Sequence, residues 1–313
     1  LHLKLPNKLW TALSVFGTTS IDHEVQKRIN EPFDVVLLTN LGFVGYVKTP
    51  YALILHDLSF LIQSSWFPWK MRLWHQAVNP KELARRADRI FTVSETTKLD
   101  AVRLLDLPEE QIETFHPGIP TLRVSRSELG GSNDLQLPTP HAQRPTPYVL
   151  TIGESDPRKN VRTAIQAVET LRSQPEFEPL QLVIIGSLRT THHAPRSEWI
   201  IRKQRVTDEE LASLYQHASA FLYPSWYEGF GLPLHEAAQF NTPCIASTHG
   251  SLPETAPDGT LFAPPNKPQL WTGLLKDVLS SPERYSTSTD LRNEQTETQG
   301  FIRWIRSVKQ KNA

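Results

Sequence analysis

Residues 223–236 limit what this chain can fold into more than any other part of the sequence. A short apolar run at 220–222 leads into them and predicts the end of a buried strand. Gly229 and Gly231 then allow backbone conformations that other residues resist, and they leave room for a ligand beside the main chain. Pro233 suits the first turn of a helix, where its missing N–H costs no hydrogen bond. The segment therefore predicts a strand, a glycine-bearing turn and a helix.

Two carboxylates flank the predicted turn, Glu228 before it and Glu236 eight positions later. A helix that opens here presents free N–H groups and a positive dipole end, which suit an anion such as a diphosphate. We expect Glu228 to lie on the loop near the reacting end of the ligand. We expect Glu236 to lie in the first helical turn and to accept hydrogen bonds from sugar hydroxyls. Two glycines before a helix are common at corners of this kind, so they indicate nucleotide binding only as part of the longer string.

The complete string resembles the E-x7-E signature of retaining glycosyltransferases of the GT-B fold, in particular glycosyltransferase family 4 (group 1). The resemblance covers about residues 50–280 and is strongest over 148–264, where it continues through 241–247 and 250–254. It implies two Rossmann-like, doubly wound α/β domains with parallel sheets that face a cleft. It also implies a nucleotide diphosphate sugar as the donor substrate. The donor-binding residues that it implies in this part of the chain are Gly229, Phe230, Gly231, Leu232 and Glu236.

A second motif follows the first predicted strand of the donor domain. Gly153 ends that strand, and two adjacent cations, Arg158 and Lys159, precede a predicted helix. Cations placed there would stabilise a diphosphate leaving group in the transition state. An isolated Arg-Lys pair is more often a solvated charge pair, but this one matches the R-K-N string whose side chains contact the donor phosphates in the family. We therefore predict that all three residues bind the donor and that both cations act in catalysis.

Two further positions take their roles from the resemblance. His56 stands at the carboxyl end of a predicted strand in a His-Asp-Leu string, which the family places near the donor sugar, with Asp57 suited to orient the ring. Taken alone, such a histidine is more often structural. Arg205 and Val206 lie where family members place main-chain contacts to the nucleobase, and an ordinary loop is the equal alternative. The predicted catalytic residues are Glu228, His56, Arg158 and Lys159.

Short apolar runs alternate with helical patterns along most of the chain, which predicts parallel sheets covered on both faces. The segment 69–87 predicts a long helical stretch that Pro80 breaks in two, and Thr207 with Glu210 predicts a helix opened by a capping box. The predicted strands are 34–38, 51–55, 89–93, 112–115, 148–152, 180–185, 199–201, 220–223, 243–247 and 260–262.

The expected domain organisation follows from these patterns and from the resemblance. We predict an N-terminal acceptor-side domain over 1–120, a linker over 121–147, a donor-binding domain over 148–283 and a C-terminal helical segment over 284–313. The linker is rich in proline, glycine and serine, which favours a loop. The last segment has an apolar helical pattern and should cross back onto the N-terminal domain, as it does in the GT-B fold.

The start of the sequence departs from the pattern of the family. The chain begins at Leu1 and shows neither the strand nor the glycine-rich turn that normally opens such a domain. We therefore expect the N-terminal domain to lack its first βα unit in this sequence. The strands at 34–38 and 51–55 would then carry exposed apolar edges.

Composition narrows the class of protein. The 33 basic and 33 acidic residues balance, which argues against a nucleic-acid polymer as a partner. The single cysteine, Cys244, indicates a reducing compartment and hence a cytoplasmic protein. No D-x-D or H-E-x-x-H string occurs, so we expect no metal and no cofactor besides the donor substrate. No apolar run approaches the roughly eighteen residues of a membrane-spanning helix.

Taken with these observations, the resemblance implies a retaining, metal-independent hexosyltransferase. It would move a sugar from a GDP- or UDP-linked donor to a carbohydrate or lipid-linked acceptor hydroxyl, in polysaccharide or glycolipid assembly. A peripheral contact with the membrane face is left open. The alternative from another class is a non-catalytic nucleotide-sugar-binding protein of the same fold. The sequence does not distinguish the nucleobase, the sugar, the acceptor or the linkage.

Overall fold

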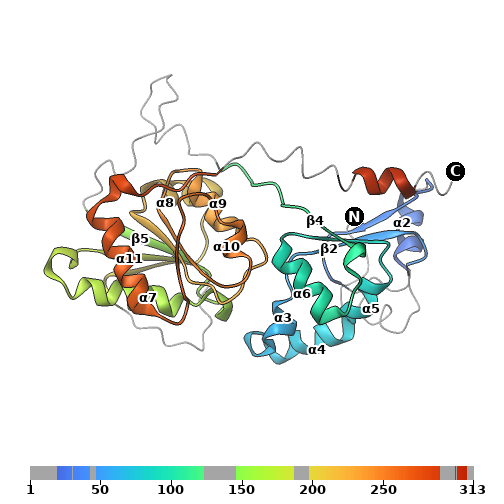
Figure 1. Cartoon of the computed structure of the whole chain (residues 1–313), viewed down its shortest axis with the longest axis horizontal. Coiled ribbons are helices and arrows are strands. Elements are labelled where there is room, and N and C mark those ends of the chain that lie inside the picture. The colour runs from blue at the N-terminus through green and yellow to red at the C-terminus, as the bar shows by residue number, and fades with distance from the viewer. Residues whose placement is uncertain are drawn as a thin grey trace, which may run out of the picture. The chain divides into compact units, whose positions relative to one another are not determined.

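The computed structural model divides the chain into two compact units. Unit 1 is Leu1–Pro117 with Asn293–Ala313, and unit 2 is Gly118–Arg292 (Figure 1). The residues that the structure describes are 20–29, 31–42, 47–122, 146–186, 197–289, 300 and 302–308. Both units are α/β, and the strands of both sheets pair in parallel. The predicted architecture of two parallel-sheet domains is therefore confirmed.

Unit 1 contains a four-stranded sheet in the order β1-β2-β3-β4. Its strands are β1 (Val36–Leu38), β2 (Tyr51–Leu55), β3 (Arg89–Thr92) and β4 (Ile112–Thr114). Its helices are α2 (Ile21–Ile29), α3 (Ser59–Ile62), α4 (Trp69–Val78), α5 (Pro80–Arg85) and α6 (Glu95–Leu105), with the 3-10 turns η1 (Ser64–Trp66) and η2 (Glu109–Gln111). Strand β2 pairs with β1 on one side and with β3 on the other. Our expectation of an exposed edge on this strand is therefore wrong, because both of its edges are hydrogen-bonded to neighbouring strands.

In unit 1, helices begin and end at residues whose chemistry favours a helix boundary. Asn79 adopts a left-handed conformation with φ of 49° and separates α4 from α5, and Pro80 opens α5 at its first position. The break predicted at this proline is confirmed. The hydroxyl of Ser94 accepts a hydrogen bond from the backbone N–H of Thr97 and caps α6.

A helix near the C-terminus packs against the sheet of unit 1. Residues 302–308 are helical, and buried Trp304 and Val308 lie in one apolar cluster with Ala52 and Phe91. The rings of Trp304 and Phe91 meet edge to face with centroids 6.4 Å apart. This part of the C-terminal segment therefore shares a core with strands β2 and β3.

Unit 2 contains a six-stranded sheet in the order β10-β9-β8-β5-β6-β7. Its strands are β5 (Tyr148–Ile152), β6 (Gln181–Ile185), β7 (Ile200–Lys203), β8 (Ala220–Tyr223), β9 (Cys244–Ser247) and β10 (Leu261–Ala263). Its helices are α7 (Val161–Arg172), α8 (Asp208–His217), α9 (Leu232–Ala238), α10 (Leu252–Thr255) and α11 (Pro268–Ser280), with the 3-10 turns η3 (Pro157–Lys159), η4 (Pro175–Phe177) and η5 (Pro282–Arg284).

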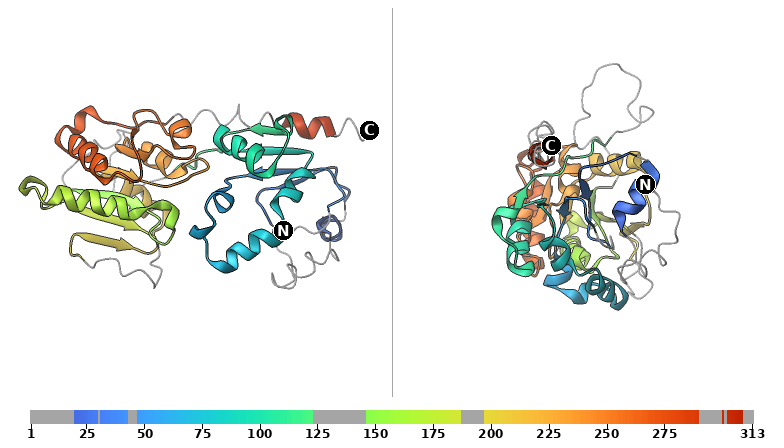
Figure 2. Two further views of the ribbon diagram at one scale, coloured as in Figure 1. Left: turned by 60° about the horizontal axis from the view of Figure 1, so that its bottom comes forward. Right: turned by 90° about the vertical axis from the view of Figure 1, so that its right-hand side faces the viewer.

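Helices cover both faces of this sheet (Figure 1 and Figure 2). Helices α7 and α11 contribute buried side chains to one core cluster, which contains the fully buried Trp271. Helices α8 and α9 contribute to the other, which contains Tyr215 and Leu234. A parallel sheet buried on both faces explains why its strands read as continuous apolar runs. The predicted linker over 121–147 lies largely outside the described residues.

The packing of the C-terminal helix gives a test of unit 1. Replacing Trp304 by alanine should lower the free energy of unfolding by about 3 kcal/mol, because it removes buried ring contacts and leaves a cavity. Trp304 is 6% exposed, whereas Ile302 on the same helix is 40% exposed. Ile302→Ala is therefore the matched control and should change the free energy little. Urea denaturation of the three proteins measures both values, and equal losses for the two variants would contradict this packing.

Candidate functional site

Two loops meet at the carboxyl edge of the sheet in unit 2. The strand order runs outward in opposite directions from β5 and β8, and these two strands pair directly. Open parallel sheets bind ligands at such a switch point, outside the carboxyl ends of the strands. Loop 153–160 follows β5 and loop 224–231 follows β8. The predicted site residues on these two loops are Gly153, Arg158, Lys159, Glu228, Gly229, Phe230 and Gly231.

Hydrogen bonds fasten the two loops to each other. The backbone N–H of Trp226 donates to the carbonyl oxygen of Arg158 at 2.7 Å. The side-chain amide of Asn160 donates to the carbonyl oxygens of Pro224 at 3.0 Å and Pro265 at 2.9 Å. The asparagine of the Arg-Lys-Asn string therefore joins three loops.

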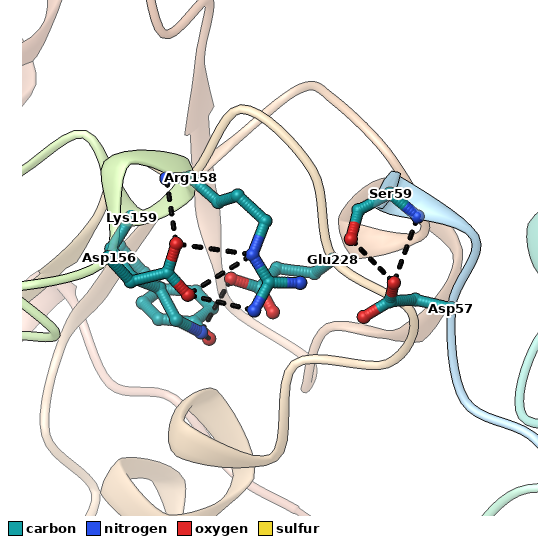
Figure 3. Close-up of polar contacts among 7 residues, drawn as sticks. Asp57, Ser59, Asp156, Arg158, Lys159 and Glu228 are labelled. Atoms are coloured by element: carbon teal, nitrogen blue, oxygen red, sulfur yellow. Dashed lines mark hydrogen bonds and ion pairs between the residues drawn. The ribbon is translucent and has the colours of Figure 1, made fainter. Parts of the chain in front are cut away.

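The ammonium of Lys159 lies between two partners (Figure 3). Its Nζ donates to Glu228 Oε1 at 2.7 Å and to the hydroxyl oxygen of Tyr223 at 2.6 Å. The Lys159 and Glu228 side chains are 17% and 12% exposed, so water screens this ion pair only partly. The sequence predicts separate roles for these two residues and contains no local signal of their direct contact. The role of Tyr223, the last residue of β8, was not predicted.

Two glycines shape the backbone around this ion pair. Gly153 has φ of +89°, and a Cβ atom there would overlap Cγ of Lys159. Gly250 has φ of +62°, and a Cβ atom there would lie 2.8 Å from the backbone nitrogen of Glu228. Ser251 donates from its backbone N–H and from its hydroxyl to the carbonyl oxygen of Glu228, at 3.1 Å and 3.0 Å. Both sides of the ion pair thus require close backbone packing. The sequence did not predict these roles of Gly250 and Ser251.

The second predicted cation, Arg158, is held by a neighbouring carboxylate (Figure 3). Its guanidinium donates to Asp156 from Nη2 at 2.8 Å and from Nε at 3.1 Å. Burial alone would raise the pKa of Asp156, but hydrogen bonds and charge from Arg158, together with the charge of Lys159, hold it below its usual value. Asp156 therefore stays ionised and fixes the guanidinium. An aspartate two positions before an arginine was a sequence signal that we did not use.

Glu236 lies just beyond the first turn of α9, since this helix begins at Leu232. The expectation of a first-turn position is wrong by one residue. Gly231, with φ of +94°, precedes the helix, and Pro233 is its second residue, as predicted. The Oε2 atom of Glu236 accepts a hydrogen bond from the buried hydroxyl of Tyr215 at 3.0 Å. Burial raises the pKa of Glu236, and burial together with the Glu236 charge raises that of Tyr215.

His56 directly follows β2 in unit 1, at the carboxyl end of the strand as predicted. Its Nε2 lies 2.8 Å from the carbonyl oxygen of Thr39. The carboxylate of Asp57 accepts from the backbone N–H of Ser59 at 2.9 Å and from its hydroxyl at 2.6 Å (Figure 3). These contacts place Asp57 at the start of α3, and its role in orienting His56 stays a prediction.

Arg205 is exposed and Val206 is half-buried, directly before the N-cap of α8. The capping box predicted there is complete. The Glu210 N–H donates to the Thr207 hydroxyl, and the Thr207 N–H donates to the Glu210 carboxylate. The contact of Arg205 and Val206 with a nucleobase stays a prediction.

The described residues contain no group of three or more His, Cys, Asp or Glu side chains placed to hold a metal ion. A helix with the length and apolarity that a bilayer crossing requires is not found in the part of the chain that the structure describes.

Comparison with known proteins identifies similar sequences. The family model described as Glycosyl transferases group 1 matches residues 138–297. O-antigen chain mannosyltransferase B from Escherichia coli is 32% identical over 219 residues, which cover 67% of this chain and 56% of that protein. The MMP alpha-(1->4)-mannosyltransferase from Mycolicibacterium hassiacum is 30% identical over 227 residues, which cover 68% of this chain and 50% of that protein. The chain thus spans about half the length of these curated relatives.

Solved structures show the same fold. Sucrose-phosphate synthase from Thermosynechococcus elongatus superposes with a TM-score of 0.64 at 20% identity, covering 100% of this chain and 79% of that one. HepE from Anabaena, solved in complex with UDP and glucose, superposes with a TM-score of 0.59 at 14% identity, covering 93% of this chain and 79% of that one. At these identities the likeness concerns the fold, and it confirms the predicted GT-B class.

The buried carboxyl group of Glu236 gives a test of the site by pH. Because its pKa in the native state lies above the ordinary value of 4.5, the native state binds this proton more tightly than the unfolded chain does. Its contribution to stability is therefore complete below 4.5 and is lost as the pH rises through the native pKa. Glu236→Gln stays neutral throughout, so the wild type should lose stability relative to this variant as the pH rises.

Urea denaturation of both proteins across this pH range measures the difference. Tyr215→Phe removes a hydrogen bond that lowers the pKa of Glu236, so the loss should move to higher pH in that variant. Parallel stability profiles for the wild type and Glu236→Gln would show that Glu236 is not perturbed by its surroundings.

Proposed function

The chain belongs to the family of group 1 glycosyl transferases, and from this we propose that it transfers a sugar from a nucleotide diphosphate sugar to an acceptor hydroxyl with retention of configuration. The observation that carries the proposal is the contact of Lys159 with Glu228 and Tyr223 at the switch point of the sheet. It joins the cation suited to the leaving diphosphate to the carboxylate suited to the reacting sugar.

The cations of the site would act on the departing diphosphate. An ammonium has three N–H donors, and the contacts that the described residues make with Lys159 use two of them. The third is available for a phosphate oxygen. Arg158, held by Asp156 on the same loop, adds a second positive charge. Hydrogen-bond donors that are fixed before the reaction stabilise developing negative charge without having to reorganise. This electrostatic stabilisation of the transition state is the largest single contribution to catalysis in many enzymes.

The glutamates would divide the remaining tasks. Glu228 would lie beside the sugar, where its carboxylate stabilises positive charge that develops at the anomeric carbon. Glu236 would accept hydrogen bonds from ribose hydroxyls. The main chain at 229–232 would lie along the donor, and Arg205 with Val206 would contact the base through their backbone. His56 would lie near the donor sugar.

We further propose that the reaction needs no bound metal ion. The sequence has no D-x-D string, and the side chains of Arg158 and Lys159 supply the positive charge that a metal would otherwise bring to the phosphates.

We propose that the transferred sugar is a hexose, and mannose is the hexose that we favour. Two relatives at 32% and 30% identity are named mannosyltransferases. One of them is named for the O-antigen chain, which supports a carbohydrate or lipid-linked acceptor and a role in polysaccharide or glycolipid assembly. The single cysteine supports the cytoplasm as its location. The nucleotide carrier would be GDP or UDP.

A surface of unit 1 supports peripheral contact with the membrane. Exposed apolar side chains gather on α3 and α4, among them Trp69 and Leu73, which are 60% and 54% exposed. Lys70 and Arg72 lie among them, and residues 58–81 contain no aspartate or glutamate. Exposed tryptophan and leucine combined with basic residues are typical of segments that lie in a bilayer interface and attract anionic lipids. We name this segment, residues 59–73, the α3–α4 surface.

Nucleotide binding tests the donor site. GDP or UDP should bind the wild type equally well with and without a chelator of divalent metals, as measured by calorimetry. Glu236→Ala should weaken the affinity by about 1.5–3 kcal/mol, the usual cost of a lost hydrogen bond to a charged group. Glu228→Ala should lower the rate of sugar transfer more than it lowers this affinity.

Glu283→Ala removes an exposed glutamate on η5 and is the control, with affinity close to the wild type. Binding that disappears with the chelator would refute metal independence. Equal affinities for the wild type and Glu236→Ala would remove the ribose role. Binding of nucleotide sugar without any turnover would favour the non-catalytic alternative.

Vesicle sedimentation tests the membrane contact. The wild type should bind vesicles of phosphatidylcholine with phosphatidylglycerol more strongly than vesicles of phosphatidylcholine alone. Trp69→Ser with Leu73→Ser should reduce this binding, because it removes the apolar part of the α3–α4 surface. The control is Leu99→Ser with Leu104→Ser, which removes two exposed leucines from α6. Equal loss in both double variants, or no binding by the wild type, would overturn the proposal.

A further inference from the structure

Tyr223 occupies a buried and closely packed position beside the site. It ends strand β8, which pairs with β5 on one side and with β9 on the other, where Tyr223 itself is the partner of Ala246. Its side chain is 1% exposed, and its ring stacks on Phe221 with centroids 5.6 Å apart. A ring buried at the end of a central strand has little freedom, so the place of its hydroxyl group is fixed by the sheet.

Lys159, in contrast, has a long and flexible side chain on a single 3-10 turn. A free lysine side chain samples many rotamers, and ordering it costs conformational entropy. Here the lysine side chain is held at two points, its aliphatic stem and its ammonium group. Its stem packs on Gly153, where a Cβ atom would overlap Cγ. Its ammonium donates to the Tyr223 hydroxyl at 2.6 Å and to Glu228 at 2.7 Å.

The hydroxyl of Tyr223 keeps its proton in these surroundings. Burial, and after it the charge of Glu228 and hydrogen bonding with this carboxylate, raise the pKa of Tyr223 well above its ordinary value. The neutral hydroxyl has both acceptor and donor capacity. It accepts from the ammonium of Lys159, and the same ammonium donates to the carboxylate of Glu228.

We propose that Tyr223 is a positioning residue of the transfer reaction, whose hydroxyl holds the Lys159 ammonium, and through it the Glu228 carboxylate, in place for the diphosphate sugar. The inference rests on the proposed function for the roles of those two groups. It adds a residue that lies outside the E-x7-E and Arg-Lys-Asn strings. Tyr223 acts through Lys159 and Glu228, so its effect should depend on their presence.

A double-mutant cycle tests this dependence. The wild type, Tyr223→Phe, Lys159→Ala and the double variant are titrated with GDP and UDP. Tyr223→Phe should weaken binding about 10-fold, as expected for a lost hydrogen bond to a charged group. In the Lys159→Ala background the same change should have little further effect. A residue that only supports the fold would weaken binding equally in both backgrounds, and that result would overturn the inference.

Tyr148→Phe is the matched control. Tyr148 is also a buried tyrosine on a strand of this sheet, and its hydroxyl donates to the carbonyl oxygen of Leu214 at 2.7 Å. This variant loses a buried hydrogen bond without touching Lys159, so its melting temperature should fall while its nucleotide affinity stays near that of the wild type. Equal affinity losses in Tyr148→Phe and Tyr223→Phe would also overturn the inference.

A second measurement needs no ligand. Acylation of Lys159 by an N-hydroxysuccinimide ester, followed by peptide mass spectrometry, reports how firmly the amine is held. Labelling should be faster in Tyr223→Phe than in the wild type and Tyr148→Phe. Equal rates in the three proteins would overturn the positioning role. If the wild type binds neither nucleotide but Tyr223→Phe is labelled faster, the proposed function fails and the positioning of Lys159 by Tyr223 stands.

Discussion

The ion pair between Lys159 and Glu228 is the interaction on which the rest of the site depends. Its charges are mostly withdrawn from water, and such a pair is stable only when further hydrogen bonds satisfy both partners. Tyr223 satisfies the ammonium. Close packing at Gly153 and Gly250 fixes the backbone on each side. Removal of either charged partner would leave an uncompensated charge in a partly dry site.

The fold places this ion pair by topology. Lys159 comes from the loop after β5 and Glu228 from the loop after β8, and these strands are neighbours although many residues separate them in the chain. The change of direction in strand order opens space above their carboxyl ends. Helices pack on both faces of the sheet, so its core fixes the strand ends from which the two loops extend. The site is therefore a consequence of strand order and of the residues at two strand ends.

The sequence predicted much of this arrangement because its signals are local. The strands at 51–55, 148–152 and 220–223 match β2, β5 and β8 residue for residue, since each is an apolar run with clear polar, glycine or proline boundaries. The capping box at Thr207 and the break at Pro80 depend on neighbouring residues alone. The contacts of the site could not be predicted in this way, because they join distant parts of the chain.

The Tyr223 contact with Lys159 spans 64 positions and requires knowledge of the strand order. The contact of Asp156 with Arg158 was local, and the sequence did contain its signal. A crystal structure of the protein with GDP or UDP bound tests the central claim most directly. We predict a phosphate oxygen within hydrogen-bond distance of Lys159 Nζ, with the Tyr223 contact retained and Glu236 hydrogen-bonded to the ribose. A nucleotide bound elsewhere, or phosphates bound while Lys159 points away from them, would contradict it.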